Sequence, residues 1–214
     1  MWIYAIFATS VIAGFCMMAL EIIGGRYLYP DFGTSVDVWA AIITVFILSI
    51  SVGSWLGGRI ADRYHSNRPL GWILLIAGIF YLLLPTYARD FSHALGPAVH
   101  QARPGSLLAA IVLFLPPSLL LGCVTPMLVK LLHATGTRVG HATGTLLFVS
   151  NIGSVLGILV ADYVLLTYFT LNANVLVMGM VLGLLGVIHI LRTVVTVGAD
   201  AVEAAAADSV AEAS

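Results

Sequence analysis

Apolar residues occur along this chain in long, nearly unbroken runs, and polar residues gather in short segments between them. The runs lie at about residues 2–24, 36–58, 69–87, 106–132, 143–167 and 172–191. Each run is long enough to cross the roughly 30 Å hydrocarbon core of a bilayer as a helix. We therefore predict an all-α fold, a polytopic membrane helical bundle with about six transmembrane helices.

The composition agrees with this pattern and excludes a soluble enzyme. Of the 214 residues, 60% are hydrophobic and 9% are charged, and the mean hydropathy is +1.05. Soluble domains carry about 25% charged residues, so a water-soluble globule could not cover its surface with so few. The net charge of −1 gives no reason to expect a nucleic-acid partner. The expected surroundings are a lipid bilayer.

Three prolines interrupt the fourth run, at Pro116, Pro117 and Pro126. A proline inside a helix has no N–H to donate to the preceding turn. The sequence therefore predicts a kinked or broken fourth helix.

Basic residues in the loops predict the orientation. With the first residue in the cytoplasm, cytoplasmic loops hold Arg59, Arg63, Arg68, Lys130, Arg138 and Arg192, and external loops hold Arg26, Arg89 and Arg103. Cytoplasmic loops usually carry the excess of Lys and Arg. We expect a multi-pass protein of the plasma (inner) membrane with both termini cytoplasmic.

Two segments, the C-terminal tail and the external segment after the third run, differ from the apolar runs in composition or spacing. Residues 1–197 would form the transmembrane domain, and residues 198–214 would form an acidic, Ala-rich cytoplasmic tail whose composition is typical of mobile segments. In the external segment 86–104, Phe91, Leu95 and Val99 are spaced by four residues. This segment is either a short interfacial helix or an ordinary loop helix.

A motif recurs in the second and fifth runs. Residues 52–57 read Val-Gly-Ser-Trp-Leu-Gly and residues 152–157 read Ile-Gly-Ser-Val-Leu-Gly, and both continue to an Ala-Asp pair that ends at Asp62 or Asp162. The two copies would cross the membrane in opposite senses. This predicts a 3+3 inverted repeat, as in many transporters.

Pairs of glycines four residues apart predict close helix contacts, because small residues let helix backbones approach in lipid. The pairs are Gly53 and Gly57, Gly140 and Gly144, Gly153 and Gly157, and Gly179 and Gly183.

Charged residues in or near the spans are the candidates for chemistry, because charges in a bilayer are costly. Glu21, Arg26, Asp37 and Asp162 form the candidate solute or charge-pair set, and all would lie toward the external face. With the nearby aromatic residues Trp39, Tyr27 and Tyr163, these acids would suit an organic cation. The plainer alternatives for Glu21 are an ion pair with Arg26 or an interfacial position from which its carboxylate reaches outward. For Asp162 the alternative is a polar contact with a neighbouring helix, and for the aromatic residues it is an interfacial belt.

No catalytic pattern stands out. The sequence has no nucleotide-binding loop, no Ser/His/Asp set and no metal-ligand spacing, so we expect no enzyme activity, no cofactor and no metal. Cys16 and Cys123 lie in apolar runs and are interpreted as small hydrophobic residues. His189, alone inside the sixth run, is interpreted as a hydrogen-bonding residue between helices.

The densest charge cluster is Arg59, Asp62 and Arg63, directly after the second run. It resembles the cytoplasmic loop motif of major facilitator transporters, in which such charges pair with helix ends and latch one conformation. The plainer alternative is that these basic residues anchor the helix end on the cytoplasmic side, as the positive-inside rule describes.

Several motifs in order resemble the membrane part of the spermidine synthase-like membrane proteins, a major-facilitator-like domain fused to a synthase domain. These motifs are residues 19–35, Val38-Trp39, residues 56–63, residues 115–126 and residues 153–157, within a matching region of about 19–166. The positions that match the recurring pattern are Glu21, Arg26, Pro30, Gly33, Trp39, Gly58, Arg59 and Asp62. The sequence holds no synthase half, so we expect no aminopropyl transfer, and Asp162 stands where the family would have a small or neutral residue.

These observations favour a non-enzymatic membrane domain that binds or moves a small solute, with cationic solutes as a favoured class. As half of a major-facilitator unit, it would act as a homo-oligomer or with other membrane subunits. The alternatives are an accessory subunit of a larger membrane complex and a membrane anchor for a separate synthase.

Overall fold

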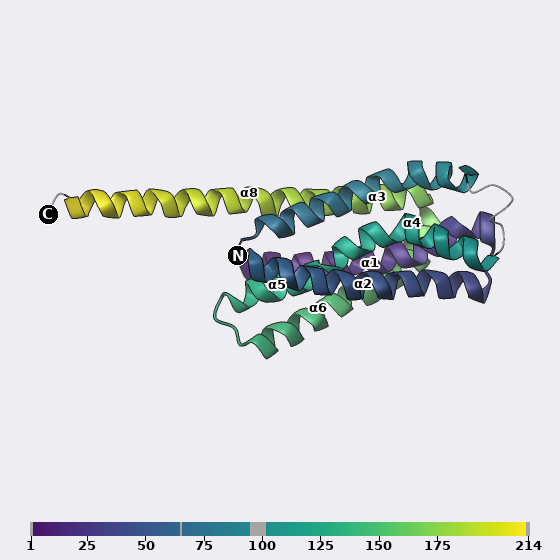
Figure 1. Ribbon diagram of the computed structural model, residues 1–214, viewed down its shortest axis with the longest axis horizontal. Helices are drawn as coiled ribbons and strands as arrows, with labels where there is room; N and C mark the ends of the chain where they lie inside the picture. The colour runs from purple at the N-terminus through teal and green to yellow at the C-terminus, as the bar shows by residue number, and fades with distance from the viewer. Residues whose placement is uncertain (1, 65, 95–101, 213–214) are drawn as a thin grey trace.

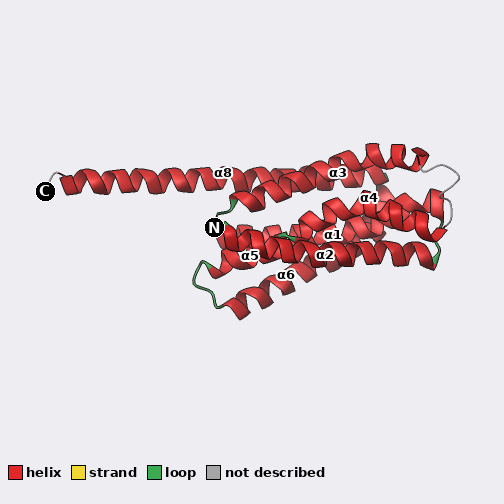
Figure 2. Ribbon diagram, in the orientation of Figure 1, coloured by secondary structure: helices red, strands yellow, loops and turns green. Residues whose placement is uncertain are grey.

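The computed structural model describes residues 2–64, 66–94 and 102–212, and within these ranges the chain is helical, with short connections and no strand (Figure 2). The elements in order are α1 (Trp2–Phe32), α2 (Val36–Arg63), α3 (Arg68–Ala94), α4 (Ala102–Gly122), α5 (Val124–His133), α6 (Val139–Val160), the π-helix η2 (Ala161–Leu165), α7 (Leu166–Tyr168) and α8 (Leu171–Glu212). The predicted all-α fold is confirmed.

In the described part of the chain, six segments are long and apolar enough to cross a membrane, which confirms the predicted number. They are Ile3–Phe32, Val36–Arg63, Arg68–Ala88, Pro104–His133, Val139–Tyr168 and Leu171–Arg192. The chain is an integral membrane protein. We call the end of the bundle with Arg63 and Arg192 the near end, and the end with Phe32 and Val36 the far end.

The helices pack as a bundle with α1 inside it (Figure 1). The closest helix pairs are α1 with α6, α2 with α4, and α3 with α8. Ile6, Leu20 and Ile23 of α1 are fully buried. Large apolar residues such as Leu83, Phe148 and Leu184 are exposed instead. Apolar residues on both the inside and the outside are what lipid requires and water would not tolerate.

The prolines break the fourth span, as predicted. The helix ends at Gly122 and restarts as α5 at Val124. Pro117 has no N–H for the carbonyl of Leu113, and the hydroxyl of Tyr87 donates to that oxygen instead at 3.0 Å. Helix α3 thus supplies the donor that Pro117 cannot give to the Leu113 carbonyl.

The fifth span contains a feature that the sequence did not predict. After Val160, helix α6 widens into the π-helix η2, which holds Asp162. Beyond it, Asn174 donates its side-chain N–H to the carbonyl oxygen of Leu165 at 2.9 Å. A π turn of this kind often occurs at functional sites.

Three helices extend further than their apolar runs. Helix α1 continues to Phe32 and ends at Gly33, whose φ of 72° suits glycine. Helix α3 continues to Ala94, so residues 86–94 belong to a spanning helix and not to a separate interfacial helix, while residues 95–101 lie outside the described residues. Helix α8 continues to Glu212 and projects past the near end (Figure 1). Of the predicted acidic tail, residues 198–212 are therefore helical.

The glycine pairs differ in what they contact. A Cβ added at Gly53 or Gly57 would meet the backbone of α4 or the α4–α5 break, and one at Gly153 or Gly157 would meet the backbone of α1. These contacts confirm the predicted close packing, and Gly179 approaches Gly78 of α3 in the same way. For Gly140 and Gly144 the prediction is wrong within this chain, because an added Cβ would meet nothing within 4 Å among the described residues.

Candidate solute site

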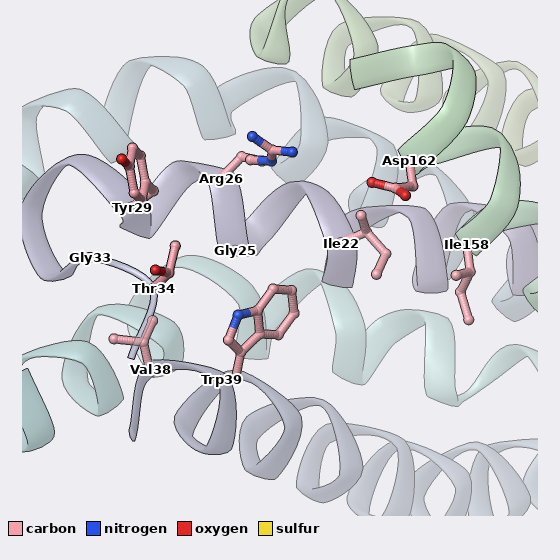
Figure 3. A pocket seen from close by; sticks show the side chains of 10 residues that line it. All are labelled: Ile22, Gly25, Arg26, Tyr29, Gly33, Thr34, Val38, Trp39, Ile158 and Asp162. Atoms are coloured by element: carbon pink, nitrogen blue, oxygen red, sulfur yellow. The ribbon is translucent and has the colours of Figure 1, made fainter. Parts of the chain in front are cut away.

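A cavity of about 580 Å³ opens at the far end between α1, α2 and the end of α6 (Figure 3). Its lining combines two charged side chains, aromatic rings and a hydroxyl, and consists of Ile22, Gly25, Arg26, Tyr29, Gly33, Thr34, Val38, Trp39, Ile158 and Asp162. Sites for small molecules usually have this mixture of apolar walls and a few polar groups.

Gly25 of α1 shapes this cavity. A Cβ at Gly25 would lie 2.9 Å from Cη2 of Trp39, so the absence of a side chain lets the indole rest against α1. A Cβ at Gly24 would lie 3.0 Å from Cζ of Phe114, on another side of the helix. Arg26 follows directly, and its exposed side chain reaches the cavity.

Asp162 enters the cavity from the π-helix η2. Its side chain is exposed, and its carboxylate is turned toward the side of the cavity where Arg26 lies (Figure 3). Among the described residues, no ion pair joins Asp162 to Arg26. The cavity therefore presents a carboxylate, a guanidinium and an indole to whatever occupies it.

A second cavity, of about 260 Å³, lies near the middle of the bundle beside the α4–α5 break. Polar residues from α2, α5 and α6 line much of it, namely Ser54, Thr125, Ser150, Asn151 and Ser154. Ser54 donates to the carbonyl oxygen of Gly122 at 3.3 Å. That carbonyl lacks the N–H donor that a regular α-helix would supply four positions later, because that residue is Pro126.

At the near end the corresponding space is almost closed. A cavity of only about 70 Å³ lies between α2 and α5, lined in part by Ala61 and Met127. Beside it, Nζ of Lys130 lies 2.8 Å from Oδ1 of Asp62. This ion pair joins α2 to α5.

Of the four residues predicted as a solute or charge-pair set, the structure brings together Arg26 and Asp162. Glu21 is half-buried and does not line the cavity, and no ion pair joins it to Arg26 among the described residues. Asp37 is half-buried in the first turn of α2, where a negative charge complements the helix dipole. It precedes two cavity residues but is not one of them.

The predicted latch cluster separates into three different contacts. The guanidinium of Arg59 lies 3.8 Å from the centre of the Trp55 ring, a cation–π contact one turn back in the same helix. The Arg63 guanidinium lies 5.9 Å from the ring of Tyr64. Within the described ranges, Asp62 is the member of this cluster for which a bond to another helix is seen, through Lys130.

His189 has the role that was predicted for it. Its Nε2 atom shares a hydrogen bond of 2.9 Å with the hydroxyl of Thr9, and both residues are buried. This bond joins α8 to α1. Within the part of the chain that the structure describes, no group of three His, Cys, Asp or Glu side chains could hold a metal ion.

Sequence reasoning missed several lining residues. Tyr29 and Thr34 lie around the turn between α1 and α2, where nothing in their spacing marks them as partners of Asp162. The polar residues Ser150, Asn151 and Ser154 were a usable signal, because polar side chains are unusual in a membrane span and tend to face protein or a water-filled cavity.

Comparisons with family models, with curated proteins and with solved structures give no match for this chain. The resemblance to the spermidine synthase-like membrane proteins therefore stays a prediction from the motifs, and the candidate site is defined by its geometry.

Proposed function

We propose that this protein binds a small solute that carries both a cationic and an anionic or polar group, and moves it across a bilayer. The observation that carries the proposal is the far-end cavity of about 580 Å³, which Arg26, Trp39 and Asp162 line together. The volume falls within the range of small-molecule sites, about 300–1,000 Å³. The proposal places both termini on the cytoplasmic side of the plasma membrane and assigns no catalysis to the chain.

The lining favours a doubly functional solute over a purely cationic one. The carboxylate of Asp162 would pair with an ammonium group, and the indole of Trp39 would add cation–π attraction. The guanidinium of Arg26 would hold a carboxylate or phosphate through two parallel hydrogen bonds. A solute with positive charges alone would be repelled by that guanidinium. The sequence favoured cationic solutes in general, and the cavity favours those that also carry an anionic or polar group.

The middle cavity supports movement as well as binding. Transporters commonly hold solutes near the bilayer midplane, where discontinuous helices expose backbone carbonyls. The α4–α5 break and the hydroxyl-bearing residues around it have this character. A six-helix unit would complete its path as a dimer or with a partner subunit.

Reconstitution into liposomes tests this function. We would measure uptake of labelled lysine, which has ammonium and carboxylate groups, against spermidine, which is only cationic, and succinate, which is only anionic. Lysine is expected to enter fastest, and Asp162→Asn and Arg26→Gln are each expected to lower its uptake about tenfold, the equivalent of about 1.4 kcal/mol. Glu21→Gln, a nearby acid outside the cavity, is the matched control and should leave uptake unchanged. Equal uptake in all variants, or uptake of none of the three probes, would contradict the proposal.

An accessory subunit is the second candidate function. Two observations favour it: the helical course of α8 as far as Glu212, and the open positions of Gly140 and Gly144 on α6. Small residues at this spacing suit contact with another membrane helix. Purification in a mild detergent should then yield stable membrane partners, whereas a monodisperse single chain would argue against this role. The anchor of a separate synthase would be one special case of such a subunit.

A further inference from the structure

Two hydrogen bonds across the middle of the bundle have the same form. Ser54 of α2 donates to the carbonyl oxygen of Gly122, at the end of α4, at 3.3 Å. Ser154 of α6 donates to the carbonyl oxygen of Gly14, in α1, at 3.4 Å. The donor Ser154 lies 100 positions after the donor Ser54 in the sequence, and the acceptor Gly122 lies 108 positions after the acceptor Gly14.

The glycine contacts follow the same two shifts. In α2, Gly53 lies against the carbonyl of Leu119 and Gly57 against that of Cys123. In α6, Gly153 and Gly157 lie 100 positions after Gly53 and Gly57 in the sequence. Gly153 lies against the carbonyl of Val11 and Gly157 against that of Phe15, which are 108 positions before Leu119 and Cys123. Six contacts thus share one pair of shifts, which independent small-residue packing would not produce.

The shift of 100 also relates Asp62 to Asp162, one at each end of the bundle. At the near end, Asp62 pairs with Lys130 of α5 at 2.8 Å. At the far end, Asp162 faces a cavity that it shares with Arg26 of α1. The shift of 108 relates Lys130 to Ile22, so Arg26 lies one helical turn beyond the equivalent position, within reach of a long arginine side chain.

The cavities beside Asp62 and Asp162 differ greatly in size. The near-end cavity measures about 70 Å³ and the far-end cavity about 580 Å³, although both lie at the equivalent helix junction. A symmetric bundle with two alternative conformations would have one end closed and the other end open in each of them.

We propose that α1–α3 and α4–α8 form an inverted repeat whose two ends carry equivalent ion pairs, Lys130–Asp62 and Arg26–Asp162, that close alternately. In the state described here the near end is closed and the far end is open. In the opposite state Arg26 pairs with Asp162, Lys130 separates from Asp62, and the middle cavity opens to the near end. This inference rests on the proposed function, because it describes how the same solute path opens first to one side of the membrane and then to the other.

A thiol reporter at the near end tests the coupling. Met127 lines the near-end cavity and is 3% exposed. The variant Met127→Cys, with Cys16→Ala and Cys123→Ala, would be labelled in nanodiscs with a maleimide, and rates would be normalised to those in SDS. Its labelling rate reports the population of the near-open state.

Charge removal at opposite ends should act in opposite directions on this one reporter. Lys130→Gln is expected to raise the labelling rate about two- to fivefold, the range for an ion pair between partly exposed side chains. Arg26→Gln is expected to lower it by a similar factor, because the near-open state loses its far-end pair. The two changes combined should return the rate close to its original value. Arg63→Gln, a near-end charge that bonds to no other helix among the described residues, is the matched control and should leave the rate unchanged.

The far-end variant decides the outcome. Arg26 lines the far-end cavity and Met127 the near-end cavity, at opposite ends of the bundle, so a lowered rate supports coupling through the fold. An unchanged or raised rate in Arg26→Gln would overturn the inference, and Asp162→Asn must act in the same direction if Arg26→Gln fails to fold. Labelling needs no solute. If the rates shift oppositely while no probe is transported, the proposed solute class fails and the coupling stands; if Asp162-dependent uptake occurs without coupling, only the inference fails.

Discussion

Replacing Gly57 by alanine is expected to destabilise the bundle, although alanine is the better helix former. A Cβ at this position would lie 2.5 Å from the carbonyl oxygen of Cys123 and 2.6 Å from its Cα. Ordinary van der Waals contact begins near 3.4 Å, so α2 and the α4–α5 break would have to separate by about 0.9 Å. Both obstructing atoms belong to the backbone and cannot rotate away.

The expected cost follows from this separation. Overpacking of a closely packed interface typically costs about 1–3 kcal/mol. Helix propensity offsets part of it, since alanine is favoured over glycine by about 0.5–1 kcal/mol in a helix. We expect a net loss of about 1 kcal/mol in the free energy of unfolding, from the difference between the midpoints of these two ranges.

The neighbouring residue supplies the control. A Cβ at Gly58 would meet nothing within 4 Å among the described residues, so Gly58→Ala gains propensity without a clash. Reversible unfolding in mixed detergent and SDS micelles, followed by circular dichroism, would measure both variants. Equal stability of Gly57→Ala and Gly58→Ala, or a more stable Gly57→Ala, would refute the packing argument.

Two further predictions concern the cavity and the broken helix. In Gly25→Ala, the new Cβ would push the Trp39 indole off α1 into the cavity, so the emission of Trp39, measured with the other tryptophans changed to phenylalanine, should shift to longer wavelength; an unchanged spectrum would contradict this. Tyr87→Phe removes the donor to the Leu113 carbonyl and should lower the free energy of unfolding by about 0.6–1.7 kcal/mol, the range for hydrogen bonds between membrane helices. Tyr4→Phe, at a residue that is 78% exposed, should leave stability unchanged, and an equal loss in both would argue against a role for the bond.

The spans and the helix break were predictable because their causes are local. An apolar run long enough to cross a bilayer forms a helix, since no other open structure satisfies its backbone in lipid. Pro126 removes a backbone donor wherever the helix lies, so a break near it was expected. Local composition gave no sign that α8 would continue into the predicted tail as far as Glu212.

The membership of the candidate site was only half predictable. The sequence offered four charged candidates, of which Glu21 was the clearest. The energetic cost of a charge in lipid does not reveal which way the side chain faces. Packing decided that Asp162 enters the cavity through a π turn, whereas Glu21 lies outside it. Lys130 and Asp62 are 68 residues apart, so no local spacing could have identified them as partners.

The sequence by itself determined that lipid surrounds this protein, that six helices cross it, and where one of them breaks, because each depends on the hydropathy and backbone chemistry of a single segment. Tertiary structure alone decided that Arg26, Trp39 and Asp162 share one cavity and that Asp62 pairs with Lys130. Which side chains meet depends on how helices rotate and approach one another, and that is fixed by close backbone contacts such as those at Gly57 and Gly157.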